Sequence, residues 1–208
     1  MDCDSKVVKK DYIDTYLKKI VPNTVLYGGR TYQNTPPKEQ QHRLHWFVGK
    51  AREEKRASER QKQAWHSFMT NNYLIPKETQ LAFPFEERLN EYGHEDTLFG
   101  LQLEKADHNI THLDNPLEHI GLEDGRTFLG KSEKAIKNLV FLAQEYPEME
   151  TKLWKTAMRF RALKLDRVML NYFRKRREKW EKKLLKPVPD LSLFDFWKLG
   201  VLLASLSK

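Results

Sequence analysis

Three short β-prone runs, each followed within three residues by glycine or proline, limit what this chain of 208 residues can fold into. They are Thr24 to Tyr27, Leu74 to Ile75 and Ile110 to Leu113. β-branched and aromatic side chains favour strands, whereas glycine and proline end them in turns. Apolar residues also recur at helical spacing in Asp11 to Ile20 and in Thr97 to Leu103. The sequence therefore predicts a domain that mixes short strands with helices.

The composition is typical of a folded chain without an export signal or a membrane span. Hydrophobic residues make up 39% of the sequence and aromatic residues 12%, which argues against intrinsic disorder. A single cysteine, Cys3, excludes a disulfide within the chain and suits a reducing cytoplasm. No run reaches the roughly 18 apolar residues that a spanning helix needs, and the first residues lack a signal-peptide pattern. We therefore expect a cytoplasmic protein.

The stretch with the most chemistry is Phe83 to His119, which gathers acids, histidines and glycines around Gly93-His94-Glu95-Asp96. Glu95 and Asp96 follow a glycine break and precede a helical pattern, so both acids are expected at a helix start. Acids there are stabilised by unpaired backbone amides and by the helix dipole, which is one explanation of the pair. The other is a carboxylate held ionised in a cleft, where it accepts a proton from a substrate hydroxyl.

A second acid pair, Asp2 and Asp4, has the spacing of a metal site. In an extended segment, residues two apart point to the same side, so the two carboxylates could face one divalent cation. From spacing alone, a solvated, frayed terminus is the favoured explanation of the pair. His112 and His119 flank the turn after the third β-prone run and could supply a nitrogen ligand, although a lone histidine is more often structural.

Two polar turns and one charged region complete the candidates. Gly28-Gly29-Arg30 is consistent with a ligand edge or with a plain turn, because glycines permit close backbone approach. Asn71 and Asn72 could hydrogen-bond the hydroxyls of a polar ligand or cap a turn. Glu39 to Gln63 is dense in charged residues and is expected to form a solvated helical excursion or a mobile flap.

Five segments in this order resemble a bacterial family 2 glycosyltransferase, and more closely the half of it that is similar to the C-terminal galactosyltransferase-type domain. They are DCD at Asp2–Asp4, VLYGGR at Val25–Arg30, FMTNNYLI at Phe68–Ile75, FEERLNEYGHEDTLFG at Phe85–Gly100 and HLDNPLEHIGLE at His112–Glu123. The resemblance covers roughly residues 1–142. It implies the α/β class, α+β in so short a form, with a partial GT-A fold.

The resemblance also implies roles for the candidate residues. Asp96 would be the base that deprotonates the acceptor hydroxyl in an inverting transfer, and Glu95 would orient that acceptor. Asp2 and Asp4 would hold Mn²⁺ or Mg²⁺ on the diphosphate of a nucleotide-sugar donor, where a cation neutralises the leaving group. His119 would complete the metal site, with His112 the weaker candidate. The substrate-binding set would be Gly28, Gly29, Arg30, Asn71, Asn72, Gly93 and His94.

The sequence departs from the family pattern before Asp2. In the family, strands and helices that bind the nucleotide precede the Asp-x-Asp motif, whereas here it follows only Met1. We therefore expect an N-terminally truncated form of the fold that binds the donor weakly or not at all, with an apolar sheet face left uncovered. Activity would then require the missing half in another chain.

The basic charge of the chain is confined to its C-terminal third. The formal net charge is +8, but residues 151–187 hold 14 Lys and Arg against 3 Asp and Glu, which leaves −3 for the rest. Residues 143–208 are expected to form a basic helical extension, with a helix at Lys131 to Ala143 before it, one or two long helices over Glu148 to Leu185, and an apolar segment at Leu191 to Leu206.

Three interpretations of this extension stay open. It could be a helical cap with a solvated basic face, or it could attach to the anionic inner face of the plasma membrane, which suits a lipid-linked glycan acceptor. The third interpretation, nucleic-acid binding, is the least favoured, because the cations form no groove-reading motif. The sequence thus predicts a glycosyltransferase that adds a hexose or N-acetylhexosamine to a saccharide hydroxyl in surface-glycan synthesis. The alternative is a non-catalytic basic helical protein that binds a membrane or nucleic acid.

Overall fold

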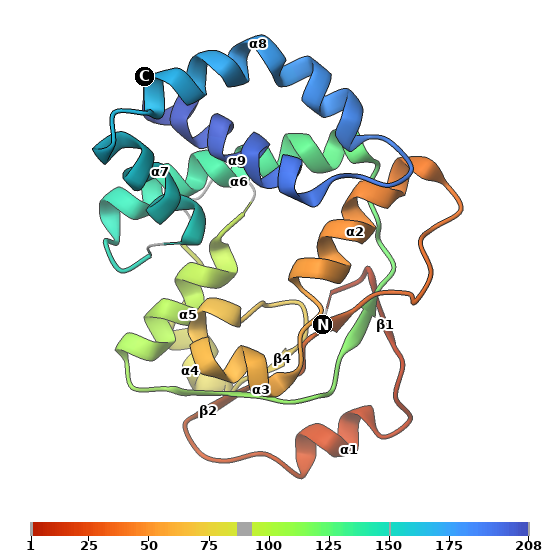
Figure 1. The fold of residues 1–208 in the computed structure, drawn as a ribbon. Helices are drawn as coiled ribbons and strands as arrows, with labels where there is room; N and C mark the ends of the chain where they lie inside the picture. The colour runs from red at the N-terminus through yellow and green to blue at the C-terminus, as the bar shows by residue number, and fades with distance from the viewer. Residues whose placement is uncertain (1, 87–92, 150, 208) are drawn as a thin grey trace. The chain divides into compact units, whose positions relative to one another are not determined.

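A computed structural model describes residues 2–86, 93–149 and 151–207 (Figure 1). The chain forms two compact units. The first comprises residues 1–36, 48–89 and 95–122, and the second comprises residues 37–47, 90–94 and 123–208. The expected mixture of helices and short strands is confirmed. The expected division after Leu142 instead falls inside a helix, α6 (Gly125–Glu145), which belongs to the second unit.

Two three-stranded sheets form the first unit. One has the order β1-β6-β3, from Ser5–Val7, Leu117–His119 and Arg30–Thr31, with β1 antiparallel and β3 parallel to β6. The other has the order β4-β2-β5, from Tyr73–Leu74, Thr24–Tyr27 and Asn109–His112, with β4 antiparallel and β5 parallel to β2. The three β-prone runs of the sequence thus supply one complete sheet.

Strand β2 organises the core because both of its faces are buried. Its four residues, Thr-Val-Leu-Tyr, are all inaccessible, which suits a central strand. Val25 and Tyr27 point to one face and contribute to a cluster with Phe68, Phe99, Leu103 and Ile110. Leu26 points to the other face, where it joins Tyr12, Tyr16 and Leu117. The alternation of side chains along a strand therefore feeds two clusters.

Helices cover this core and also correct one expectation in part. The first unit holds α1 (Tyr12–Leu17), α4 (Lys77–Ala82), α5 (Glu95–Lys105), α3 (Ala57–Arg60) and the 3-10 turns η2 (Gln61–Gln63) and η3 (Trp65–Ser67). The segment Glu39 to Gln63 is largely helical, as expected, but it is not solvated throughout. Leu44, Trp46, Val48 and Arg60 are buried, in α2 (Arg43–Arg52), which follows η1 (Gln40–His42), and in α3.

Helix α5 carries the expected acid pair in its first turn. Phe99 and Leu103 lie one turn apart and insert into the β2 cluster, so packing fixes the helix against the sheet. The expected short helix at Glu86 to Leu89 falls largely at 87–92, outside the described residues.

The second unit is helical. Besides α6 it contains α7 (Lys152–Ala162), α8 (Asp166–Leu184) and α9 (Leu191–Leu206). Side chains of Asp124, Thr151 and Asp190 cap the first turns of α6, α7 and α9 by accepting hydrogen bonds from backbone amides. The apolar segment Leu191–Leu206 forms a helix that packs on α8, α6 and α7, with Trp197 and Leu202 fully buried. Among the described residues, no helix combines the length and the apolar character that crossing a membrane requires.

Candidate active site

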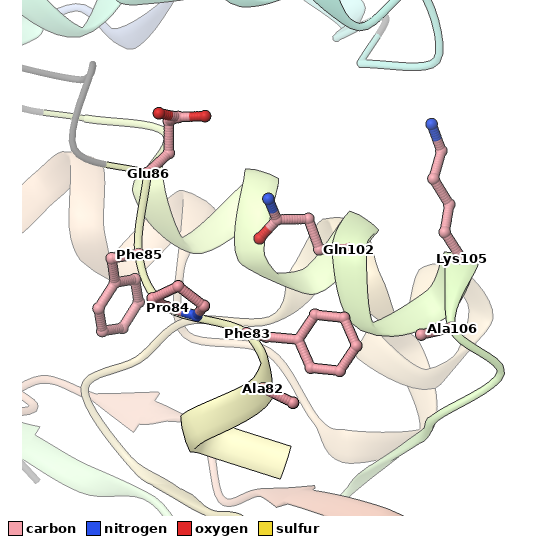
Figure 2. A pocket seen from close by; sticks show the side chains of 8 residues that line it. All are labelled: Ala82, Phe83, Pro84, Phe85, Glu86, Gln102, Lys105 and Ala106. Atoms are coloured by element: carbon pink, nitrogen blue, oxygen red, sulfur yellow. The ribbon is translucent and has the colours of Figure 1, made fainter.

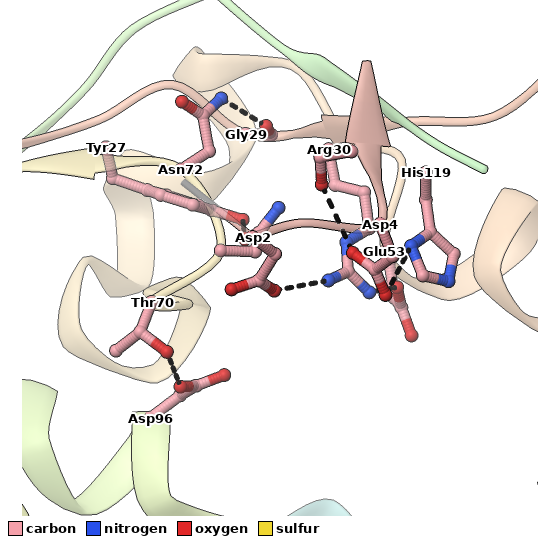
Figure 3. Close-up of polar contacts among 12 residues, drawn as sticks. Asp2, Asp4, Tyr27, Gly29, Arg30, Glu53, Thr70, Asn72, Asp96 and His119 are labelled. Carbon is pink, nitrogen blue, oxygen red and sulfur yellow. Dashed lines mark hydrogen bonds and ion pairs between the residues drawn. The ribbon is translucent and has the colours of Figure 1, made fainter. Parts of the chain in front are cut away.

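The acid pair begins α5, and Asp96 is held by a residue from another segment. Its Oδ1 accepts a hydrogen bond from the Thr70 hydroxyl (Figure 3). Burial raises the pKa of the Asp96 carboxyl, and the neighbouring Glu95 raises it further. The Thr70 bonds and the positive charge of Arg30 oppose this effect, and the net pKa lies above the usual value. Asp96 is therefore bound by Thr70, which lies outside its own helix, and its carboxylate is more basic than a solvated one.

Two adjacent residues connect Asp96 to the N-terminal acids. Thr70 binds the Asp96 carboxylate, and the carbonyl of Asn71 accepts a hydrogen bond from the backbone amide of Asp2 at 3.1 Å. The phenol of Tyr73 lies close enough to both Asp96 and Asp2 to be affected by their charges. Burial raises the pKa of Tyr73, and the negative charges of Asp96 and Asp2 raise it further. Both acids therefore act on one phenol, although they are 94 positions apart in the sequence.

Asp4 and His119 form the second part of the site. The antiparallel register places Ser5 opposite His119, and the Nδ1 atom of His119 lies 3.6 Å from Oδ2 of Asp4. Burial lowers the pKa of the His119 imidazole, and Arg30 lowers it further, while Asp4 has a smaller effect in the opposite direction. The ring is therefore neutral at neutral pH, which is the form that binds metal ions.

Arg30 lies between the carboxylates of Asp2 and Glu53 (Figure 3). Its Nη2 atom is 3.8 Å from Oδ2 of Asp2, and its Nη1 atom donates to Oε2 of Glu53 at 3.1 Å. Glu53 also accepts a hydrogen bond from the hydroxyl of Tyr32, whose ring meets that of His119 edge to face at 5.6 Å. Burial lowers the pKa of Arg30, but Glu53, Tyr32 and Tyr27 together raise it above its usual value, so the guanidinium stays charged.

The expected metal ligands are close together without forming a complete metal site. Asp4 and His119 offer a carboxylate oxygen and a neutral imidazole nitrogen, and their 3.6 Å separation allows both to reach one cation. Asp2 instead faces the Arg30 guanidinium. In the part of the chain that the structure describes, no group of three His, Cys, Asp or Glu side chains is arranged to hold a metal ion. Carboxylate oxygens suit Mn²⁺ and Mg²⁺, whereas an imidazole nitrogen suits transition metals better than Mg²⁺. Asp2 would have to leave Arg30 to join Asp4 and His119.

The glycine turn and Asn72 are interior parts of this site. Asn72 is fully buried, and its Oδ1 accepts hydrogen bonds from the hydroxyls of Tyr12 and Tyr16, both at 2.6 Å. Its Nδ2 donates to the carbonyls of Gly29 and Asn115 at 2.7 and 2.9 Å. These bonds use both of its polar atoms. Asn72 therefore supports the site and is not placed to contact a substrate.

The two glycines are required by close neighbours. Gly29 has a φ of +91°, and a Cβ atom there would come within 2.5 Å of the Arg60 guanidinium. Gly28 is similarly enclosed by the Tyr16 hydroxyl and the Asn115 carbonyl. The turn therefore positions Arg30 at the start of β3, and its own surface is not open to a ligand. Asn71 is also buried, with its carbonyl on Asp2.

Gly93 and His94 belong to the second unit. Gly93 has a φ of +108° and lies against Ala135 of α6, where its carbonyl accepts a hydrogen bond from Nδ2 of Asn138 at 3.1 Å. His94 has a φ of 72°. The backbone of Gly93 thus has a packing role, and nothing in its contacts indicates a ligand.

His112 is separated from His119 by its environment. Its Nδ1 accepts a hydrogen bond from Nε of Arg60 at 3.1 Å, which leaves Nε2 as the donor to the carbonyl of Ala64 at 3.0 Å. Both ring nitrogens are therefore occupied within the fold. His112 is a structural histidine, in line with its weaker candidacy as a metal ligand.

Figure 2 shows a hollow of about 640 Å³ elsewhere on the first unit, between the end of α4 and the second half of α5. Phe83 and Phe85 line it together with Gln102, Lys105 and Ala106. Gln102 lies six residues after Asp96, or about 9 Å along the helix axis. The hollow is therefore apart from the carboxylate site.

Sequence reasoning missed Glu53, Tyr32 and Thr70, which position Arg30, His119 and Asp96. Glu53 lies in the charge-rich region that was expected to be solvated, and no local pattern distinguishes it from neighbouring acids such as Glu54 and Glu59. Comparison with models of protein families, with curated proteins and with solved structures found no match. Function is therefore inferred from the residues of the site.

Proposed function

We propose that this chain carries the acceptor-side part of an inverting glycosyltransferase. The reaction transfers a hexose or N-acetylhexosamine from a nucleoside diphosphate sugar to a saccharide hydroxyl, including that of a lipid-linked glycan, in surface-glycan synthesis. The observation that carries the proposal is the link through Thr70 and Asn71, which joins the half-buried carboxylate of Asp96 to the N-terminal Asp2. A GT-A glycosyltransferase requires such a neighbourhood, with a base and a diphosphate-binding acid pair on either side of the reacting carbon.

In this proposal Asp96 acts as the general base. The acceptor oxygen forms a bond to the anomeric carbon while the bond from that carbon to the diphosphate breaks, and the hydroxyl proton passes to Asp96. Burial makes this carboxylate more basic than a solvated one, which favours the transfer. Glu95, in the same first turn of α5, orients the acceptor by accepting a hydrogen bond. The nucleoside diphosphate leaves on the opposite face, so the configuration inverts.

The leaving group requires positive charge. Arg30 is a charged guanidinium between Asp2 and Glu53, at the side of the site where the diphosphate would depart. A divalent cation, held by Asp4 and His119 and by Asp2 once its carboxylate leaves Arg30, would neutralise the same charge when bound.

The experiment compares three chains in a transfer assay with Mn²⁺, a panel of nucleoside diphosphate sugars and saccharide acceptors. Asp96→Asn should lower the release of nucleoside diphosphate by about 100-fold or more, because an amide cannot accept the proton. Asp107→Asn is the matched control, since Asp107 is exposed at the other end of the helix and has a positive φ that Asn tolerates. Equal measurable rates in the parent and Asp96→Asn would reject the assigned base, whereas no turnover in any of the three chains would reject catalysis by this chain alone.

Cation binding is tested separately from turnover. Titration of Mn²⁺, followed by electron paramagnetic resonance, should show binding to the parent chain and weaker binding to Asp4→Asn. Binding that is indifferent to this substitution would place the cation elsewhere and remove it from the proposal.

The second candidate is a non-catalytic basic helical protein that acts through residues 151–186. The exposed cations of α8 favour it, and they are compatible with the glycosyltransferase proposal as well.

A further inference from the structure

The solvent-facing side of α8 begins with large apolar side chains. Leu165, Val168 and Tyr172 follow one another at spacings of three and four, so they form one stripe along the helix. They are 45%, 66% and 52% exposed, and Leu163, in the turn before the helix, is 68% exposed. Four exposed apolar residues within ten positions are more than scattered surface hydrophobics, and a cluster of this kind indicates an interaction site.

The same stripe continues with cations. Arg176, Lys179 and Lys183 follow Tyr172 at spacings of four, three and four, and all three are exposed. The guanidinium of Arg176 lies over the Tyr172 ring, 5.9 Å from its centroid. We define the α8 stripe as Leu165, Val168, Tyr172, Arg176, Lys179 and Lys183. It is apolar in its first half and basic in its second, and it contains no carboxylate.

Most of this stripe faces away from the helix packing, although the ring of Tyr172 contacts that of Trp180 edge to face at 5.6 Å. The adjoining side of α8, which includes Met169, Phe173, Trp180 and Leu184, is buried, and the helix packs on α9. The acid Glu181 also lies away from the stripe, where it accepts hydrogen bonds from Arg177 and from the indole of Trp197. The orientation of α8 is thus fixed by its buried side, which leaves the stripe available for a partner.

We propose that the α8 stripe binds the surface of an anionic lipid bilayer. A helix that lies in the interface inserts its apolar side chains to the depth of the headgroups while cations contact lipid phosphates and carboxylates. Leu165 and Val168 supply the first attraction, and Arg176, Lys179 and Lys183 supply the second.

A polynucleotide would bind only the basic half of the α8 stripe. Phosphates would pair with the cations but would leave Leu163, Leu165 and Val168 in water. The membrane contact therefore lies on α8 and not on the apolar segment Leu191–Leu206, which is buried as α9.

Vesicle co-sedimentation of the full chain tests the proposal. The parent should bind vesicles of phosphatidylserine and phosphatidylcholine, and binding should weaken at high salt and on phosphatidylcholine alone. The triple variant Arg176→Gln, Lys179→Gln, Lys183→Gln should bind roughly 100-fold more weakly. The matched control, Lys152→Gln, Arg167→Gln, Arg174→Gln, removes the same charge from exposed positions off the stripe and should retain most of the binding.

The apolar half has its own variant. Leu165→Ser with Val168→Ser should weaken vesicle binding roughly tenfold without altering the melting curve, because both side chains are already exposed. The proposal is overturned if the parent does not bind anionic vesicles, or if the stripe and control triple variants lose equal affinity, which would show a response to net charge alone. It is also overturned if a single-stranded oligonucleotide binds more tightly than vesicles and ignores the two serine substitutions.

Discussion

At the scale of single residues, one buried amide determines the geometry of the turn before Arg30. Burial raises the pKa values of Tyr12 and Tyr16, so both phenols stay protonated and donate to the same oxygen of Asn72. Because two hydroxyls donate to one atom of the Asn72 amide, that atom is the oxygen. The amide nitrogen therefore points the other way and donates to the carbonyls of Gly29 and Asn115. Three segments, α1, the glycine turn and the segment of Asn115, are thereby held to one side chain.

His112 carries a prediction about pH. Burial lowers its pKa to about 4, and the nearby charge of Arg60 contributes in the same direction. Because the unfolded chain binds this proton near pH 6.5, the contribution of neutral His112 to stability is complete above that pH and is lost as the pH falls toward 4. The loss should reach about 2 kcal/mol. The measurement is urea unfolding of the parent chain between pH 7.5 and about pH 4.5.

The variant His112→Gln isolates this effect. Glutamine can keep a donor to the Ala64 carbonyl and an acceptor for Arg60 but does not titrate. The free-energy difference between parent and variant should therefore shift in favour of the variant as the pH falls. A difference that stays constant over the same range would show that His112 is not the titrating group.

Single residues also show where sequence reasoning stops. Glu95 and Asp96 could be placed at a helix start because a glycine break and a helical pattern are both local features. Glu53 and Thr70 could not be found, because their importance comes from contacts with Arg30 and Asp96 over 23 and 26 positions. Asn72 was expected to contact a substrate but is fully buried, because local pattern does not distinguish a buried support from a ligand contact.

At the scale of elements, the close approach of α5 to the turn η3 predicts opposite effects for two helical glycines. A Cβ atom at Gly100 would lie 2.7 Å from the backbone carbonyl of Trp65, whereas one at Gly130 of α6 would meet no atom within 4 Å. Alanine is the better helix former by about 1 kcal/mol. Gly130→Ala should therefore stabilise the chain by about 0.5–1 kcal/mol. Gly100→Ala should destabilise it by about 1–3 kcal/mol, because backbone must move.

The pair is measured by thermal unfolding followed by circular dichroism, with each glycine variant serving as the control for the other. Stabilisation by both would show that α5 can move away from η3 at little cost. That outcome would also weaken the argument that packing fixes the position of Asp96.

The strands show why some elements are predictable and others are not. β2 and β5 contain β-branched and apolar residues with clear turns after them, and both were expected. β6 was missed, because Leu117-Glu118-His119 has one apolar residue and pairs only with segments more than 80 positions earlier. It nevertheless places His119 beside Asp4. Elements defined by long-range pairing are not visible in local periodicity.

At the scale of the whole molecule, both compact units are discontinuous in sequence, so their bounds differ from a single division after residue 142. Residues 37–47 belong with residues 123–208. The ring of His45 stacks on Phe128 at 4.5 Å, and Gln40 donates to the carbonyl of Leu185 at 3.0 Å. A change of composition at residue 143 cannot reveal that residues 37–47 pack with a unit formed much later in the chain. The basic helical unit is therefore not a simple appendage.

This discontinuity predicts how a truncated chain behaves. A fragment of residues 1–122 keeps Leu44 and Trp46, which are buried in the full chain, but lacks the remainder of their unit. Newly exposed apolar surface promotes association, so the fragment should aggregate. The same fragment with Leu44→Ser and Trp46→Ser should stay monomeric in light scattering. In the full chain these two substitutions should instead cost roughly 4 kcal/mol or more of stability, because they empty a packed interior. A parent fragment that is monomeric, or a serine fragment that still aggregates, would contradict this dependence of residues 37–47 on residues 123–208.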